Sequence, residues 1–218
     1  MLVISAIHLG AQSNTRPTPT TMTKMVVRLS GPEIQPGSFS ALPKMIYRAG
    51  EHYARIEDPP DAKQKIQKLT IIAEPDAYSI NLIDKKGTHA TDQGGANDLH
   101  MPIVLPFDPK HELPTLDKLE FGGELEFFEA AGAQKRAGPI INAKPTDAYE
   151  IETAYGPAVL VVRSGSDVPV TLSWKTKAGE YRYEYITYQD LPFQKELFEK
   201  PGGIQIREIP PERDGSPG

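Results

Sequence analysis

The chain has 218 residues, with 24 Lys and Arg against 29 Asp and Glu and a formal net charge of −5. This balance disfavours nucleic acid as a partner, because proteins that depend on phosphate contacts need a basic face. The absence of cysteine excludes disulfides, Cys-ligated zinc, thiolate nucleophiles and iron–sulfur clusters. The 21 Pro and 18 Gly favour short strands and turns over long helices.

The beginning of the chain is typical of an export signal. Residues 1–11 are apolar, a run shorter than the ~20 residues that span a bilayer but long enough for the core of a signal peptide. No Lys or Arg precedes the run, so we interpret residues 1–23 as a truncated signal peptide and a polar linker. The alternative is an N-terminal strand or tail. Export predicts a periplasmic or secreted protein.

The next part of the chain alternates short apolar strands with turns, a pattern typical of antiparallel sheet. Residues 25–30 form the first predicted strand, and two hairpins follow within residues 45–56 and 69–83. Residues 88–90 form another short strand. This meander contains no crossover helix, which argues against a βαβ architecture and a doubly wound nucleotide fold.

The middle of the chain is predicted to hold a loop and then helix. Residues 92–113 are long enough for a functional loop or a lid. An apolar stripe over residues 115–133, weakened by Gly122-Gly123, predicts one or two short helices. We expect them to pack on the sheet, with a movable cover over a cavity as the alternative.

The second half returns to strands, predicted at residues 148–153, 158–163, 170–175 and 181–188. In the last pair, one face carries Val, Leu, Trp and three Tyr side chains, and the other carries charges and hydroxyls. One side of the sheet is therefore expected to be covered and the other to be wet. Residues 209–218 are polar and rich in Pro, and they predict a disordered tail.

The sequence contains no standard catalytic or cofactor-binding motif. The spacing of His89, Asp92, His100 and His111-Glu112 matches no set of metal ligands, and turn chemistry explains Ser164-Gly165-Ser166-Asp167. His52 lies on a predicted strand beside charged residues, where a surface role is expected. We therefore expect no enzymatic activity, no metal site and no cofactor. A hydrolase ranks third, after the two binding functions described below.

The end of the chain carries a more specific pattern of short blocks in a fixed order. The blocks are Val168-Pro169-Val170, Leu172-Ser173-Trp174, Gly179-x-Tyr181-x-Tyr183, Tyr188-Gln189-Asp190-Leu191-Pro192-Phe193 and Leu197-Phe198-Glu199-x-Pro201-x-Gly203-Ile204. This order resembles the closing segment of LolA-like proteins, the outer-membrane lipoprotein-sorting carriers of Gram-negative bacteria. The resemblance is recognisable in residues 168–206 and compatible in topology over residues 24–208.

The resemblance implies a mainly β (α+β) fold in a single domain, residues 24–208. That fold is one curved antiparallel sheet, an open half-barrel, with one to three short helices covering its concave face. The resemblance also implies a non-catalytic carrier of lipoprotein acyl chains in the periplasm, without a cofactor.

We therefore predict a monomer that binds an apolar ligand in the bacterial cell envelope, namely a lipid or a lipoprotein acyl chain. An envelope protein partner fits this interpretation, whereas nucleic acid and a stable membrane span do not. The alternative is a structural or interaction module with a closed core. A shift of one residue in strand register reverses which side chains of a strand point inward. The side chains expected to line the cavity are Met45, Tyr47, Ile71, Ile80, Leu82, Phe127, Phe128, Leu172, Trp174 and Tyr183.

Overall fold

The computed structural model describes residues 18–91 and 113–210. The strands of the first part are β1 (Thr21–Ser30), β2 (Lys44–Ala49), β3 (Tyr53–Glu57), β4 (Lys68–Ala73), β5 (Asp76–Asn81) and β6 (Lys86–Thr91). Those of the second part are β7 (Gln134–Ala137), β8 (Thr146–Thr153), β9 (Gly156–Arg163), β10 (Pro169–Thr176), β11 (Gly179–Pro192) and β12 (Gln205–Glu208). The described helices are α2 (Glu124–Ala130) and the 3-10 turns η1 (Phe39–Ala41), η2 (Pro114–Leu116) and η3 (Lys195–Phe198).

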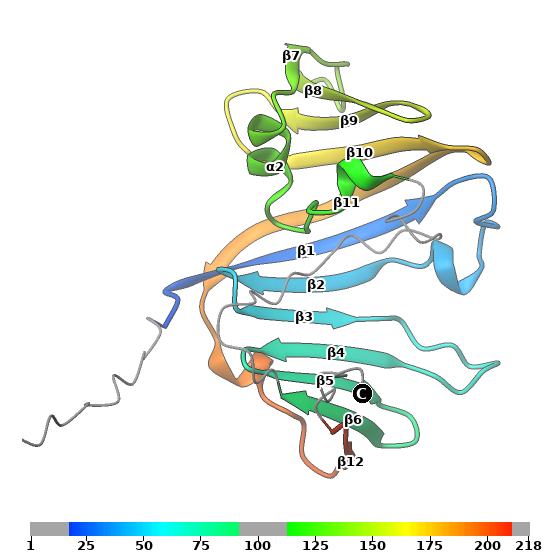
Figure 1. Ribbon diagram of the computed structural model, residues 1–218, viewed down its shortest axis with the longest axis vertical. Helices are drawn as coiled ribbons and strands as arrows, with labels where there is room; N and C mark the ends of the chain where they lie inside the picture. The colour runs from blue at the N-terminus through cyan, green and yellow to red at the C-terminus, as the bar shows by residue number, and fades with distance from the viewer. Residues whose placement is uncertain (1–17, 92–112, 211–218) are drawn as a thin grey trace, which may run out of the picture.

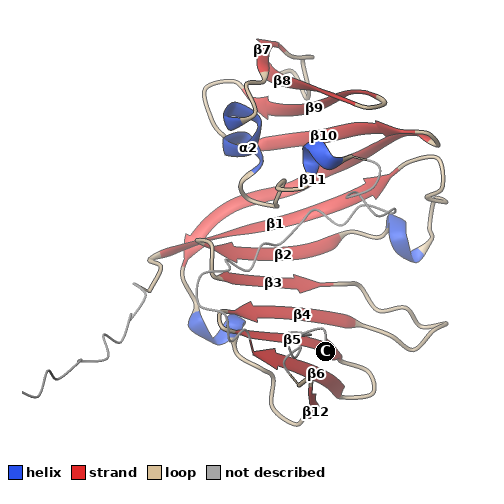
Figure 2. Cartoon of the chain, viewed as in Figure 1, coloured by secondary structure: helices blue, strands red, loops and turns tan. Residues whose placement is uncertain are grey.

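All twelve strands belong to one open sheet, in the order β12-β6-β5-β4-β3-β2-β1-β11-β10-β9-β8-β7 (Figures 1 and 2). Neighbouring strands run antiparallel, except that β12 pairs in parallel with β6. The sheet does not close, and its two edges are β7 and β12. The prediction of a mainly β, antiparallel, open sheet is confirmed. The helical part is confirmed only in part, since one α-helix lies within the described residues.

Most predicted strands are present, with two differences at the edges and one at the start. The strand β1 begins at Thr21, inside the predicted linker, because Met22 pairs with Leu191 and is 2% exposed. Neither β7 nor β12 was expected. All four residues of β7 are exposed, so it lacks the alternation that reveals a half-buried strand. The predicted export signal and the loop at residues 92–113 lie outside the described residues, apart from the loop's last residue, Leu113.

The sheet buries opposite faces in its two halves, here named face A and face B. Met25, on face A of β1, belongs to a first core that includes Leu160, Leu172 and Trp174. The helix α2 and the turn η2 cover this core, where Phe128 is fully buried. Met22, three residues earlier on the same strand, points to face B and belongs to the second core.

The second core lies under the β2–β6 half of the sheet, on face B. Leu69, Ile71 and Ile80 are at most 1% exposed there, and Phe198 of η3 packs against them. The expectation of one covered side and one wet side is therefore wrong for this sheet as a whole. The helices are also divided, because α2 and η2 cover face A whereas η3 lies against face B.

Candidate functional site

The strands β3 to β6 carry apolar side chains on both faces. On face B these side chains form the closed second core. On face A the register aligns Ala54 with Ile72, Ile72 with Ala77, and Ala77 with Ala90. With Ile56 beside them, these residues form what is called here the apolar face, which consists of Ala54, Ile56, Ile72, Ala77 and Ala90.

The apolar face has no helix over it among the described residues. The helix α2 and the turn η2 lie over the β8–β11 half of face A (Figure 1). Four of the five side chains of the apolar face are half-buried, and Ala54 is 4% exposed. Strands that are apolar on both sides are typical of a sheet covered on both sides. This half of face A is therefore the best candidate surface for an apolar ligand.

A groove continues the same face toward the β12 edge. Its volume is about 590 Å³, and it runs across β4, β5, β6 and β12. Three of its side chains are cationic and four are hydroxyls or amides. The groove, called here the basic groove, is lined by Ile66, Lys68, Ser79, Ile80, Asn81, Lys86, Gly87, Thr88, Gln205, Ile206 and Arg207.

The ten side chains predicted to line one cavity lie in two groups on opposite faces. Ile71, Ile80 and Leu82 belong to the second core or pack against it, with Tyr47, and Met45 shares their face by register. The remaining five, from α2, β10 and β11, belong to the first core or pack against it. Contact between any of these ten side chains and a ligand stays a prediction. The five are Phe127, Phe128, Leu172, Trp174 and Tyr183.

Six of these ten side chains are buried within the two cores, among them Trp174 at 1% exposure. Ile80 is the one that also lines the basic groove. The residues of the apolar face were not among the ten. Ile72 directly follows Ile71, so the sequence marks both faces of β4 as apolar and leaves open which one is covered.

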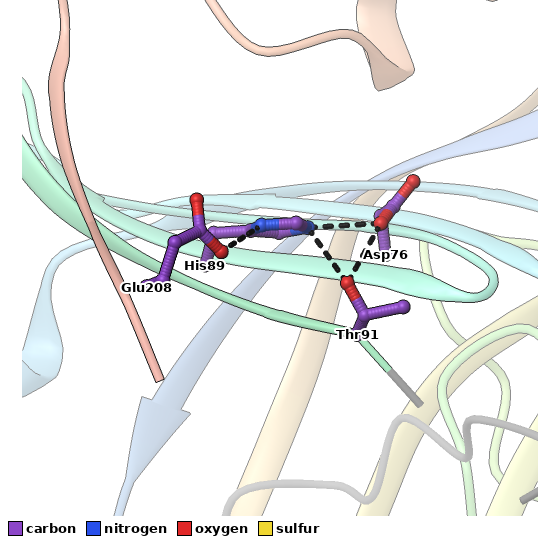
Figure 3. A network of polar contacts seen from close by, with 4 residues as sticks. All are labelled: Asp76, His89, Thr91 and Glu208. Carbon is purple, nitrogen blue, oxygen red and sulfur yellow. Dashed lines mark hydrogen bonds and ion pairs between the residues drawn. The ribbon is translucent and has the colours of Figure 1, made fainter. Parts of the chain in front are cut away.

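A hydrogen-bonded histidine joins the last strand to the sheet on face B (Figure 3). The ring of His89 lies with Nε2 at 2.8 Å from Asp76 Oδ1 and Nδ1 at 2.6 Å from Glu208 Oε2. It also stacks on Tyr78, with the ring centroids 4.5 Å apart. Partial burial lowers the pKa of His89, but its hydrogen bonds to Asp76 and Glu208 outweigh burial and raise the pKa.

The geometry around His89 indicates a structural role, in which its ring acts as a clamp that holds β12 to β6 and β5. Two carboxylates on one imidazole favour a doubly protonated ring, which serves poorly as a metal ligand. Among the described residues, no group of three or more His, Asp or Glu side chains is arranged to hold a metal ion. The predicted spacing of His89 with Asp92 and the later histidines lies partly outside the described residues.

A second polar pair fixes α2 to the sheet. The Tyr185 hydroxyl donates a hydrogen bond of 2.6 Å to Glu124 Oε1, and Glu124 is 1% exposed. Burial raises the pKa of Glu124, partly offset by the bond from Tyr185. Nearby, Arg48 forms an ion pair of 2.6 Å with Glu120 and donates a bond of 2.7 Å to the Phe121 carbonyl.

A buried carboxyl with a raised pKa is also a common feature of active sites. In this chain its hydrogen bond to Tyr185 anchors a helix at the border of the first core, which accounts for Glu124 structurally. Ser164, considered above for its Ser and Asp neighbours, donates a bond of 2.9 Å to Asp147 at an exposed turn. These contacts give both polar groups a structural role.

Comparison with known proteins gives similarity at the level of fold. No protein-family model and no curated protein matches the chain. Of the solved structures, 52 chains match. One is an uncharacterised conserved protein from Thermus thermophilus, with a TM-score of 0.52 and 9% identity over 87% of this chain and 91% of that one. At that identity the similarity concerns the fold alone.

Two other matching structures are more distant. PNGF-II has a TM-score of 0.34 at 8% identity over 87% of this chain, which spans only 31% of PNGF-II. A putative outer membrane lipoprotein-sorting protein domain from Vibrio parahaemolyticus has a TM-score of 0.32 at 8% identity, over 78% of this chain and 83% of that one. The LolA-like resemblance thus has a distant structural neighbour, which is too weak to carry a functional argument.

No helix within the described residues has the length and apolar character needed to cross a bilayer.

Proposed function

We propose that this protein is a non-catalytic binding protein of the bacterial cell envelope that holds an acyl chain against the apolar face. The observation that carries the proposal is that the apolar face and the second core lie on opposite faces of β3 to β6. Their face B is closed by the second core, while their face A has no helix over it among the described residues. An acyl chain laid on face A would gain about 25 cal/mol for each Å² of apolar surface removed from water.

The alternative of an interaction module is favoured by a different observation. Six of the ten predicted cavity side chains are buried in closed cores, which is the arrangement expected of a module without an internal cavity. In that case an apolar segment of an envelope protein would occupy the apolar face. A small uncharged ligand separates the two functions, because a protein-binding surface has little affinity for a single alkyl chain.

The test is titration calorimetry of the full chain with dodecanol, an uncharged alkyl chain. We expect saturable binding that Ile72→Asp weakens at least about tenfold, because a buried carboxylate opposes an apolar ligand. The matched control is Ile140→Asp, since Ile140 is 77% exposed and lies outside both cores. Ala77→Asp provides a second variant if Ile72→Asp unfolds. Absence of dodecanol binding to the wild-type chain would overturn the proposed function.

A further inference from the structure

The basic groove contains cations but no anion among its described lining residues. Lys68, Lys86 and Arg207 are exposed, and no described carboxylate forms an ion pair with them. Asp84 and Asp61, the aspartates nearest in sequence to the two lysines, accept hydrogen bonds within their own turns. Asp84 accepts the backbone N–H of Lys86 at 3.0 Å, and Asp61 accepts those of Lys63 and Gln64.

Several other exposed cations of the sheet have acidic partners, although Arg163 and Lys175 have none among the described carboxylates. Arg28 pairs with Glu184, Arg136 pairs with Glu150 at 2.6 Å, and Lys135 pairs with Asp147 at 3.1 Å. In a chain with a net charge of −5, the three cations of the groove form a local concentration of positive charge without described acidic partners. Like charges gathered in one groove create a positive potential that attracts anions.

The sheet register places these cations in two rows across the strands. Lys68, Asn81, Lys86 and Gln205 are aligned on β4, β5, β6 and β12. Thr70, Ser79, Thr88 and Arg207 form the next row. The groove therefore presents cations together with hydroxyl and amide groups, which are the donors that bind carboxylate and phosphate oxygens.

The rim of the groove is held in place by Asn81. Its Oδ1 accepts the backbone N–H groups of Gln67 at 3.0 Å and Ile83 at 3.2 Å. Its Nδ2 donates a bond of 3.2 Å to the Lys65 carbonyl. These bonds connect the end of β5 with the segment before β4, so that the strands carrying Lys68 and Lys86 keep their relative positions.

The third row of the same face is apolar and consists of Ile72, Ala77 and Ala90, with Ala54 beside them. Lys68 and Ile72 are four residues apart on one strand, which corresponds to about 13 Å. Along the strands, face A thus changes from cationic and polar to apolar. The distance of this change corresponds to a small lipid headgroup and the first part of its acyl chain.

We infer that the basic groove binds the acidic headgroup of an anionic lipid whose acyl chain lies on the apolar face. This inference rests on the proposed function and names the class of its ligand. Lys68, Lys86 and Arg207 supply the charge, and Ser79 and Thr88 supply neutral donors. The cations are exposed, so the headgroup sets preference among lipids while the alkyl chain provides most of the affinity.

The experiment compares dodecyl phosphate with dodecanol, both below micelle-forming concentrations, by titration calorimetry at low salt. The wild-type chain is expected to bind dodecyl phosphate about tenfold more tightly than dodecanol, since three exposed charge contacts together contribute roughly that factor. The triple variant Lys68→Gln/Lys86→Gln/Arg207→Gln is expected to bind both ligands equally. Rising salt is expected to reduce the wild-type preference, because screening weakens contacts between exposed charges.

The matched control removes three exposed lysines outside the groove, with Lys63→Gln/Lys118→Gln/Lys177→Gln, and is expected to keep the preference. Equal binding of the two ligands by the wild-type chain, or a preference that survives the groove triple variant, overturns the headgroup site and leaves dodecanol binding intact. Inorganic phosphate that displaces dodecyl phosphate at similar concentration would overturn a lipid ligand in favour of a free anion. Failure of the proposed function is distinguishable from failure of the headgroup site, because in the first case dodecanol does not bind at all.

Discussion

At the scale of single residues, His89 makes the stability of the C-terminal strand depend on pH. Its ring contacts carboxylates on two other strands, β5 and β12. These contacts raise its pKa in the folded protein above the ordinary value of 6.5. A raised pKa means that the folded state binds the proton more tightly than the unfolded state does.

We therefore expect the stabilisation by His89 to be fully present below pH 6.5 and to be lost as the pH rises through the raised folded-state value. Thermal unfolding of the wild-type chain and of His89→Gln, followed between pH 5 and about 9, checks this. The difference in Tm should shrink as the pH rises. A difference that stays constant or grows over that interval would contradict the clamp.

The buried pair of Tyr185 and Glu124 predicts the cost of removing one hydrogen bond. Tyr185→Phe leaves the buried Glu124 carboxyl without its hydroxyl donor. A lost partner of this kind costs about 1–3 kcal/mol, which urea unfolding measures as a change in midpoint. Tyr188→Phe is the control, because Tyr188 is a neighbouring and partly buried tyrosine without this bond. Equal effects of the two substitutions would argue against the pair.

At the scale of elements, the two cores predict two regions of local stability. Phe128 on α2 belongs to the first core, and Phe198 on η3 belongs to the second. Each is at most 2% exposed, so truncation to Ala should cost about 3–5 kcal/mol.

Hydrogen exchange shows which strands lose stability in each variant. Phe198→Ala should raise exchange mainly in β3 to β6, and Phe128→Ala mainly in β8 to β10, since each removes packing from one half of the sheet. An even rise over all strands in both variants would indicate one cooperative core and contradict the division.

The strands show how far sequence patterns lead. Alternation found the hairpin of β10 and β11, because Leu172 and Trp174 lie opposite Tyr183 and Tyr181 on one covered face. It missed β12, whose parallel pairing with β6 joins residues more than a hundred positions apart. Without that pairing, Arg207 is only a charge near the C-terminus, and its place beside Lys68 and Lys86 has no sequence signal.

At the scale of the whole molecule, composition predicted a β protein, but it left the covered faces open. The strand β4 contains Leu69, Ile71 and Ile72, so both of its faces are apolar in sequence, and a one-residue register decides which lies inward. The cavity residues chosen from sequence accordingly fell on both faces. The residues of the apolar face, all alanines and isoleucines on short strands, were recognisable only once the register was known.

The overall charge is equally uninformative about the site. The net charge of −5 gives no sign of a basic groove, because the cations are gathered by the pairing of β4, β6 and β12. The open sheet therefore combines two closed cores with one amphipathic surface. Its polar part is the basic groove, which extends from β4 to β12, and its apolar part adjoins the first core through Ile56.

The central claim, that an alkyl chain lies on face A of β3 to β6, is tested most directly by photo-crosslinking. A dodecyl alcohol bearing a diazirine near its chain end would be bound to the full chain, irradiated and located by peptide mass spectrometry. We predict labels concentrated on β3 to β6, at or next to Ile56, Ile72 and Ala77, and suppressed by excess dodecanol. Labels spread over the exposed surface, or confined to the β8–β11 half of the sheet, would contradict the claim.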